Sequence, residues 1–304
     1  MLETSLCGIR MKNPTMLASG ILGLTGASIE RVAQGGAGAA VTKCLGKEQR
    51  VGFRNPTVIA YEHYVMNAMG MCNPGIENYK EELGMAKKSG IPIIANVFGG
   101  TPEEFAYVAS RAEEYGADGV ELNVSCPNVI EGEKLGMVIG KDAALVENVV
   151  SAVKSRIKVP VFVKLTPNVS SIEEIALAAE RGGADGITAI NTLGPGLAIN
   201  IEARKPILGN KFGGVSGPAI KPIALACVYK IYEKVSIPII GVGGITTGRD
   251  AIEMMMAGAR VVQVGSAVYV RGLNVFSKIC KEIEGWLSAN GYRSIEEIVG
   301  VAHE

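Results

Sequence analysis

The feature that most restricts the fold of this chain is the alternation of two short signals, each placed before a β-prone run. One signal is a Gly-Ala pair, and the other is an apolar residue followed by proline. Short apolar runs that alternate with helical segments are typical of a parallel sheet covered on both faces. The runs predict eight strands, at residues 15–18, 40–43, 91–94, 119–124, 159–163, 186–191, 237–240 and 261–265.

Helical patterns occupy the segments between these runs. The segment 102–115 has Thr101 in position to cap the helix and Pro102 at the first helical position, which proline favours. The segment 171–181 carries Glu173 and Glu174 in its first turn, where carboxylates suit the helix dipole. Further helices are expected at 146–157, 220–234, 248–256 and 275–287.

Repeated strand–helix units of this kind predict an α/β fold, a single (β/α)8 TIM barrel that takes in residues 1–304 as one domain. Barrels commonly reach this length as one unit. An open doubly wound sheet is the alternative, but the Gly-x-Gly-x-x-Gly motif expected after its first strand is missing.

Two long segments are additions to the strands and helices of a minimal barrel. Residues 46–78 follow the second strand and residues 193–217 follow the sixth, and both are rich in Gly, Pro and Asn. Long loops in a compact domain are usually lids or binding loops. Both would leave the C-terminal ends of strands, where barrel active sites lie.

Charge and composition exclude several classes of function. Lys+Arg number 30 and Asp+Glu also number 30, so the basic surface that binds nucleic acid or an anionic membrane is not expected. No apolar run approaches the ~20 residues that span a bilayer. Residues 1–10 lack the pattern of a secretory signal peptide. We therefore expect a cytoplasmic protein that binds neither nucleic acid nor a membrane.

The cysteines and histidines predict no metal site. The six cysteines are scattered without a C-x-x-C pair, so neither a zinc ribbon nor an iron–sulfur cluster is expected within this chain. His63 and His303 are the only histidines, which argues against a histidine-based metal site or a Ser-His-Asp triad.

Polar side chains and glycines recur at the C-terminal ends of the predicted strands. Lys43 and Lys164 each end a hydrophobic strand, and two cations that converge there favour an anionic ligand. Gly243-Gly244 and Gly265-Ser266 end the seventh and eighth strands, the usual phosphate site of this fold. We therefore expect a cofactor or substrate that carries a phosphate.

Cys126 stands at the tip of the loop that follows the fourth predicted strand. Pro127 ends the strand pairing, and Asn123 and Asn128 lie on either side of the thiol. Because rigid scaffolds present chemistry on such loops, we predict that Cys126 is a catalytic acid–base group. The alternative is a small buried hydrophobe, the usual role of a free cysteine.

Two loops of this sequence resemble the signature loops of the class 1 dihydroorotate dehydrogenases. They are Asn-Ala-Met-Gly-Met-Cys-Asn-Pro-Gly at 67–75 and Asn-Val-Ser-Cys-Pro-Asn at 123–128. The resemblance extends, in order, over essentially the whole chain. It implies an FMN-binding (β/α)8 barrel that oxidises dihydroorotate to orotate in de novo pyrimidine (UMP) biosynthesis.

The resemblance also implies roles for individual residues. Cys126 would be the base that takes a proton from C5 of dihydroorotate, while C6 gives a hydride to FMN. Lys43 would contact both FMN and substrate, and Lys164 would stabilise the reduced flavin. The other expected substrate-binding residues are Asn67, Ala68, Met69, Gly70, Met71, Asn123, Asn128, Asn191 and Thr192. The expected FMN-binding residues are Ser19, Lys43, Cys44, Asn96, Asn123, Lys164, Ile190, Gly217, Gly243, Gly244, Gly265 and Ser266.

Within that family the sequence is most similar to the NAD-linked branch, class 1B. In that branch the barrel pairs with a subunit that carries FAD and a 2Fe-2S cluster. A homodimer of this chain inside such a heterotetramer, with NAD as the electron acceptor, is therefore expected. The fumarate-linked class 1A is the alternative. Class 2 enzymes use a serine base and carry an N-terminal extension; because this sequence has Cys126 and we expect no extension, class 2 is not expected.

Three other interpretations stay open. A dihydropyrimidine dehydrogenase-like barrel shares the cysteine loop but acts on dihydrouracil or dihydrothymine, which lack the carboxylate. A flavin-free phosphate-binding barrel, such as an isomerase or aldolase, would explain the glycines but not the two loops. A non-catalytic subunit that only docks a partner would not need Lys43, Lys164 and Cys126 together.

Overall fold

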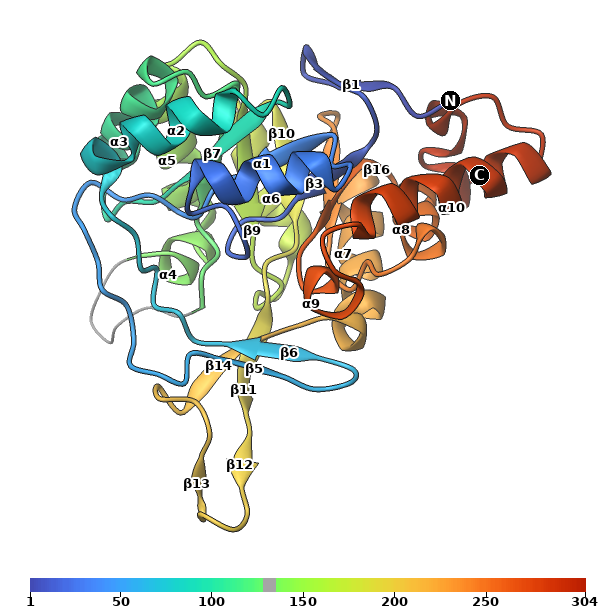
Figure 1. The fold of residues 1–304 in the computed structure, drawn as a ribbon. Helices are drawn as coiled ribbons and strands as arrows, with labels where there is room; N and C mark the ends of the chain where they lie inside the picture. The colour runs from blue at the N-terminus through green and yellow to red at the C-terminus, as the bar shows by residue number, and fades with distance from the viewer. Residues whose placement is uncertain (128–134) are drawn as a thin grey trace.

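The computed structural model describes residues 1–127 and 135–304, and Asn128 lies outside them. Parallel strands close into a barrel in the order β10-β15-β16-β3-β4-β7-β8-β9, which is their order along the chain (Figure 1). All eight predicted strands are confirmed, and the fold is a (β/α)8 barrel. The strands are β3 (Thr15–Leu17), β4 (Ala39–Val41), β7 (Ile93–Val97), β8 (Gly119–Asn123), β9 (Val161–Leu165), β10 (Gly186–Ala189), β15 (Ile239–Val242) and β16 (Ala259–Val264).

Three prolines mark the beginnings of barrel strands. Pro92, Pro160 and Pro238 stand directly before β7, β9 and β15. Proline has no N–H to donate, so it is tolerated at the first position of a strand. Each of these prolines still uses its carbonyl, which accepts from the backbone N–H of Ala40, Val120 or Ile187 in the neighbouring strand.

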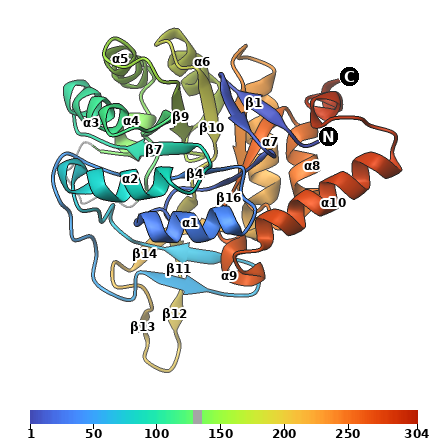
Figure 2. The same cartoon turned by 45° about the horizontal axis from the view of Figure 1, so that its top comes forward.

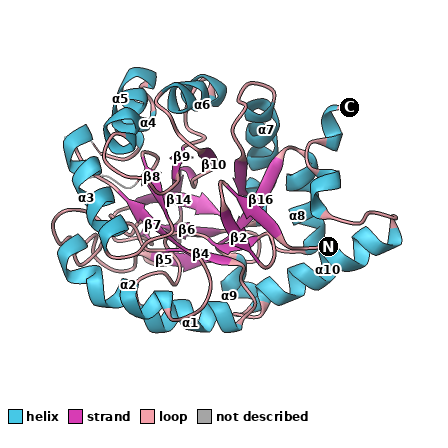
Figure 3. Ribbon diagram, turned by 90° about the horizontal axis from the view of Figure 1, so that it is seen from above, coloured by secondary structure: helices cyan, strands magenta, loops and turns pink. Residues whose placement is uncertain are grey.

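Helices surround the barrel, as the view from above shows (Figure 3). The six predicted helices are confirmed within three residues at each end. Helices α1, α2, α4 and α9 were not predicted. The helices are α1 (Gly26–Gln34), α2 (Lys80–Lys87), α3 (Pro102–Glu114), α4 (Met137–Gly140), α5 (Ala143–Lys154), α6 (Ile172–Arg181), α7 (Lys221–Tyr232), α8 (Gly248–Met256), α9 (Ala267–Arg271) and α10 (Val275–Ala289), with 3-10 turns η1 (Ile76–Tyr79), η2 (Pro218–Ile220), η3 (Ile295–Ile298) and η4 (Val301–His303).

An N-terminal hairpin, which was not predicted, closes one end of the barrel. Strand β1 (Thr4–Leu6) pairs antiparallel with β2 (Ile9–Met11). Leu6 and Met11 are buried in a cluster with Met16, Phe162 and Ile240 of the barrel. The two termini lie close together beside α10 (Figure 2), and Ile295 donates its backbone N–H to the carbonyl of Met1.

The interior of the barrel changes from apolar to polar along the strands. Phe162, which packs against the hairpin side, and Lys164 are two residues apart in β9, so both point to the same side of the strand. Nearer the C-terminal ends the buried side chains are Asn96, Glu121, Lys164, Thr188 and Gln263.

The two long segments lie where they were expected, and they fold into a single sheet. This roof sheet has the order β11-β14-β6-β5 and covers the C-terminal end of the barrel (Figure 1). Its central pair joins the two segments, because Val65 of β6 lies opposite Ser216 of β14. The strands are β5 (Val58–Ala60), β6 (Val65–Asn67), β11 (Leu193–Leu197) and β14 (Phe212–Ser216), and β12 (Ile199–Asn200) pairs with β13 (Lys205–Pro206) in a projecting hairpin.

Within the described residues, no helix is both long and apolar enough to cross a membrane.

Candidate active site

A cavity lies between the C-terminal ends of the barrel strands and the roof sheet. Strand ends supply its floor and one wall, and Val58, Val65, Asn67 and Ser216 line it from the roof sheet. Most residues predicted for the site come together here. They are Ser19, Lys43, Cys44, Asn67, Met69, Gly70, Met71, Asn96, Asn123, Cys126, Lys164, Ile190, Asn191, Thr192, Gly217, Gly243, Gly244, Gly265 and Ser266.

Ala68 is not among the residues that line the cavity. Its side chain is fully buried in a cluster with Met66, Ala198 and Leu208 on the other side of the roof sheet. Its backbone N–H donates to the carbonyl of Thr57 at 2.8 Å. Ala68 therefore holds the loop in place, and neither its side chain nor its N–H is available for a ligand. The predicted contact from Asn128 lies outside the described residues.

Both predicted lysines are buried at the cavity. Lys43 is 7% exposed, and its Nζ lies 3.5 Å from Sδ of Met69. Lys164 is 5% exposed, and its Nζ lies 3.1 Å from Oε1 of Gln263 and 3.7 Å from Oε1 of Glu121. Burying a charge is costly unless the charge is paired. The two cations make the cavity suitable for an anionic ligand.

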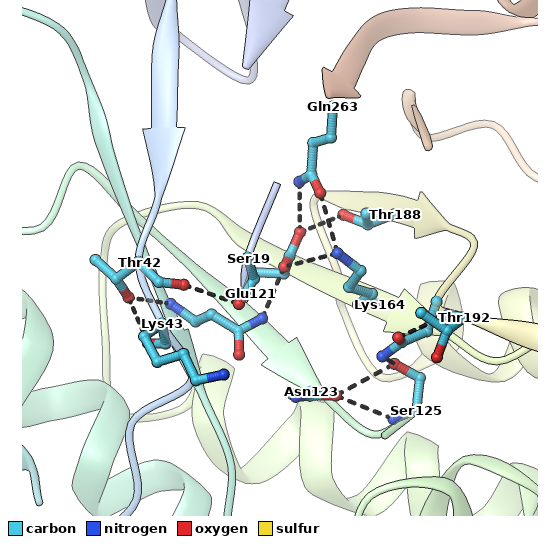
Figure 4. A network of polar contacts seen from close by, with 12 residues as sticks. Ser19, Thr42, Lys43, Glu121, Asn123, Ser125, Lys164, Thr188, Thr192 and Gln263 are labelled. Carbon is cyan, nitrogen blue, oxygen red and sulfur yellow. Dashed lines mark hydrogen bonds and ion pairs between the residues drawn. The ribbon is translucent and has the colours of Figure 1, made fainter. Parts of the chain in front are cut away.

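A hydrogen-bond network forms the floor beneath Lys164 (Figure 4). Asn96 donates from Nδ2 to Oε1 of Glu121 at 2.7 Å. Gln263 donates from Nε2 and Thr188 from Oγ1 to Oε2 of Glu121, at 2.7 and 2.9 Å. Glu121, Thr188 and Gln263 were not predicted from the sequence as site residues. The alternation of Gly119, Glu121 and Asn123 along β8 is the signal that could have placed Glu121 inside the barrel.

The amide side chains on the thiol side of the cavity are linked through Ser125. Asn191 donates from Nδ2 to Oγ of Ser125 at 2.8 Å, and Oγ of Ser125 lies 3.3 Å from Oδ1 of Asn123. Oδ1 of Asn191 accepts from the backbone N–H of Thr192 at 2.7 Å. These contacts fix which end of each amide donates and which accepts. Ser125 was not predicted from the sequence either.

Cys126 lies partly buried at the cavity, on the loop after β8. Its carbonyl accepts from the backbone N–H of Met137 at 3.0 Å. Gly136 has φ 49°, and a Cβ there would lie 2.6 Å from the carbonyl oxygen of Cys126. Only glycine fits this contact without a shift, so the segment before α4 holds the backbone of the thiol in place.

Cys44 also lines the cavity, and it is buried. Burial raises the pKa of its thiol, and the charge of Lys43 offsets this effect in part. A buried neutral thiol behaves as a small hydrophobe, so the side chain of Cys44 forms an apolar part of the cavity wall.

The loop 67–75 is anchored over the cavity by Asn73. Oδ1 of Asn73 accepts from the backbone N–H groups of Gly46 and Gly75, at 3.1 and 2.9 Å. Its Nδ2 donates to the carbonyl of Met71 at 2.9 Å. These bonds position the segment that contributes Met69, Gly70 and Met71 to the cavity wall.

Glycines form the end of the cavity that was predicted to bind phosphate. Gly244 has φ 73°, and a Cβ there would lie 2.6 Å from Cβ of Lys221, at the start of α7. Glycine is required on both grounds. Gly244 lets the backbone of the loop after β15 lie against α7, and the peptide groups of this loop are left at the surface of the cavity.

Comparison with known proteins agrees with this geometry. The family model for dihydroorotate dehydrogenase matches residues 1–287. The chain belongs to the dihydroorotate dehydrogenase family. A relative in Methanothermobacter thermautotrophicus is 51% identical over 304 residues, which cover 100% of this chain and 99% of the relative. A Methanosarcina mazei relative is 52% identical over 99% of this chain and 95% of its own length. One from Methanocaldococcus jannaschii is 49% identical over 100% of this chain and 99% of its own length.

All three relatives are named dihydroorotate dehydrogenase B (NAD(+)), catalytic subunit. The resemblance drawn from the two signature loops is thereby confirmed at the level of the family and of its NAD-linked branch. No group of three or more His, Cys, Asp or Glu side chains that could hold a metal ion occurs in residues 1–127 and 135–304.

Proposed function

We propose that this protein oxidises dihydroorotate to orotate with FMN, as a step of pyrimidine (UMP) biosynthesis. The observation that carries the proposal is a single cavity that Cys126, Lys43 and Lys164 all line. When a CH–CH unit is oxidised, one hydrogen leaves as a proton and the other as a hydride, so the reaction needs a base and a hydride acceptor. The names of the full-length relatives support the same reaction.

The cavity residues fit FMN at both ends. Gly243, Gly244, Gly265 and Ser266 offer peptide groups and small side chains to a phosphate at the ends of β15 and β16. At the floor, Lys164 offers a cation, and Oδ1 of Asn96 is a buried acceptor with no partner in the described part of the chain. When bound, FMN supplies the acceptor for the hydride. Lys164 would stabilise negative charge at the ring end of the cofactor.

The remaining polar wall would hold dihydroorotate. Asn67, Asn123 and Asn191 carry amides that can both donate and accept, which suits a ring of alternating N–H and C=O groups. Lys43 would contact both substrate and cofactor, and Thr192 and the segment 69–71 would complete the wall. We leave Ala68 out because its N–H and side chain are already used. Asn128 stays a predicted contact.

Cys126 would act as the base. It takes the proton from C5 of dihydroorotate as the hydride leaves C6, and the electron pair of the C5–H bond becomes the second bond between C5 and C6. The thiol is fixed by the contact of its own backbone with Gly136 and Met137. Its neighbour Ser125 is held by Asn191 and Asn123. Holding the base in place raises the rate of the reaction, because less conformational ordering is then needed in the reaction step.

The electrons would pass on to NAD through a partner subunit with FAD and a 2Fe-2S cluster. A heterotetramer built on a homodimer of this chain would be the working assembly. The words NAD(+) and catalytic subunit in the names of the relatives support an NAD acceptor and a partner subunit. The cytoplasm stays the predicted location.

The test is the visible absorption spectrum of the purified protein, before and after dihydroorotate is added without oxygen. We expect a yellow protein that bleaches. A colourless protein that cannot take up FMN would contradict the proposal. A yellow protein that bleaches with dihydrouracil but not with dihydroorotate would move the substrate to the dihydropyrimidines.

The same sample, once reduced, identifies the electron acceptor. Fumarate should leave the reduced protein bleached, and NAD should restore the colour only when the co-purified partner subunit is present. Rapid recovery with fumarate alone would assign the chain to the fumarate-linked branch.

A further inference from the structure

The buried polar layer beneath the cavity contains a carboxylate that the proposed reaction does not use. Glu121 is fully buried in β8. Of the described residues, Glu121 and Thr188 are not among those that line the cavity, whereas Asn96, Lys164 and Gln263 are. Figure 4 shows the side chains of Thr188, Lys164 and Gln263 converging on Glu121 from three strands. The carboxylate therefore touches the floor of the cavity from below.

The hydrogen bonds to Glu121 set the orientation of two side-chain amides in the floor of the cavity. A carboxylate only accepts hydrogen bonds, so Asn96 and Gln263 both present their NH2 groups to it, each at 2.7 Å. Their carbonyl oxygens must then point elsewhere. Oε1 of Gln263 accepts from Nζ of Lys164 at 3.1 Å. Oδ1 of Asn96 is buried without a partner in residues 1–127 and 135–304, so the floor offers an acceptor to a ligand N–H.

Glu121 also balances the charge of the floor. Its Oε1 lies 3.7 Å from Nζ of Lys164, and both side chains are buried. Charges interact more strongly in a buried site than in water. The negative charge of Glu121 therefore reduces the positive potential that Lys164 exerts on anything bound above it. Residues that tune a cofactor in this way stand behind the ligand-contacting side chains and orient them.

We propose that Glu121 is a positioning residue that sets the reduction potential of bound FMN, and that it acts through Asn96, Lys164 and Gln263. The inference rests on the proposed function, since it needs FMN in this cavity. It goes further, because it assigns the redox tuning to a pair of opposite charges and makes Glu121 the member that lowers the potential.

The test is the midpoint potential of FMN in the full-length protein, measured by equilibration with a reference dye. Glu121→Gln keeps the shape of the side chain and removes its charge. The uncompensated Lys164 should then favour the reduced flavin, and the potential should shift to more positive values. Asp118→Asn is the matched control, because Asp118 precedes the same strand at its other end and pairs with Lys87 at 2.5 Å.

For a second variant we expect the midpoint potential of FMN to shift in the opposite direction. This variant also tests the proposal if Glu121→Gln does not fold. Thr188→Val removes one donor from Glu121 and leaves the cavity lining unchanged. The carboxylate is then less neutralised by its neighbours, so the potential of FMN should become more negative.

The outcomes separate the two proposals. A wild-type protein that takes up no FMN would overturn the proposed function. Wild-type protein that binds FMN, with an unchanged potential in Glu121→Gln or an equal shift in Asp118→Asn, would overturn the role of Glu121 alone. An unchanged or more positive potential in Thr188→Val would overturn it too.

Discussion

Nδ2 of Asn191 donates a hydrogen bond to Oγ of Ser125 at 2.8 Å, and this bond ties the end of β10 to the loop that carries Cys126. The two residues are 66 positions apart in sequence. The hydroxyl of Ser125, which is not among the groups that line the cavity, thus holds an amide of the proposed substrate wall next to the predicted base.

Ser125→Ala should therefore weaken the reaction without removing any group that reacts. Asn191 loses a part-buried hydrogen bond, which contributes ~0.5–1.5 kcal/mol. We expect flavin reduction by dihydroorotate to slow by up to about tenfold, as measured by anaerobic stopped-flow absorption. Ser151→Ala is the control, because Ser151 bonds to the carbonyl of Gly182 outside the cavity. Equal effects of the two substitutions would remove Ser125 from the site.

Cys126→Ser tests the base directly. The variant should keep its FMN, and flavin reduction near neutral pH should slow by a factor between about 10² and 10⁴, the usual contribution of a general base. Cys227→Ser makes the same chemical change on α7 and should reduce the flavin at the wild-type rate. Near-normal reduction in Cys126→Ser would show that another group takes the proton.

Lys164→Ala tests the charge pair of the floor in the absence of substrate. The substitution leaves Glu121 buried without its cation, which costs about 3–5 kcal/mol of folding free energy. We expect a lower melting temperature and poor retention of FMN. Adding Glu121→Gln to this variant should restore the melting temperature, because the uncompensated charge is gone, but not the retention of FMN. A double variant as unstable as Lys164→Ala would contradict the pairing of the two charges.

Acid stability should depend on Glu77, which follows the loop 67–75. Hydrogen bonds from Arg111, Tyr107 and Tyr115 lower the pKa of Glu77 to about 2 from its ordinary value of 4.5. A lowered pKa in the folded state stabilises the fold above the unfolded value and loses this effect as the pH falls. We expect part of the acid destabilisation between pH 4.5 and 2 to disappear in Glu77→Gln, as measured by melting temperature against pH. The exposed Glu202→Gln is the control, and identical profiles for both variants would contradict the prediction.

Much of the barrel could be predicted because its signals are local. The prolines before β7, β9 and β15 and the Gly-Ala pairs act on their own segments, and they marked the strands correctly. Helix α1 was missed although its signal is local, because Thr25 caps it and the buried Ile29 and Val32 lie about one turn apart. Helix α2 offers less, since it has no side-chain cap and buries only Leu83 and Ala86. The N-terminal hairpin was missed because its burial depends on the finished barrel.

The contacts across the floor of the site could not be predicted for a related reason. The alternation along β8 could place Glu121 inside the barrel, but only the closed barrel brings Glu121 and Gln263 to Lys164. The contacts of Asn73 likewise join positions whose proximity follows from the folded loop. Positions of single side chains at strand ends were predictable, whereas their partners across the barrel were not.

The pairing of Val65 with Ser216 in the roof sheet has a consequence for the way the chain folds. The two residues are 151 positions apart, and Oγ of Ser216 donates to the carbonyl of Val65 at 3.2 Å. Contacts that close such long loops are entropically costly and form late. The neighbouring strands of the barrel should therefore assemble first, and the cavity should be enclosed only when both halves of the chain are in place. Competence to bind a ligand then depends on both halves of the chain being folded, so the uptake of a coloured cofactor would report the completion of folding in real time.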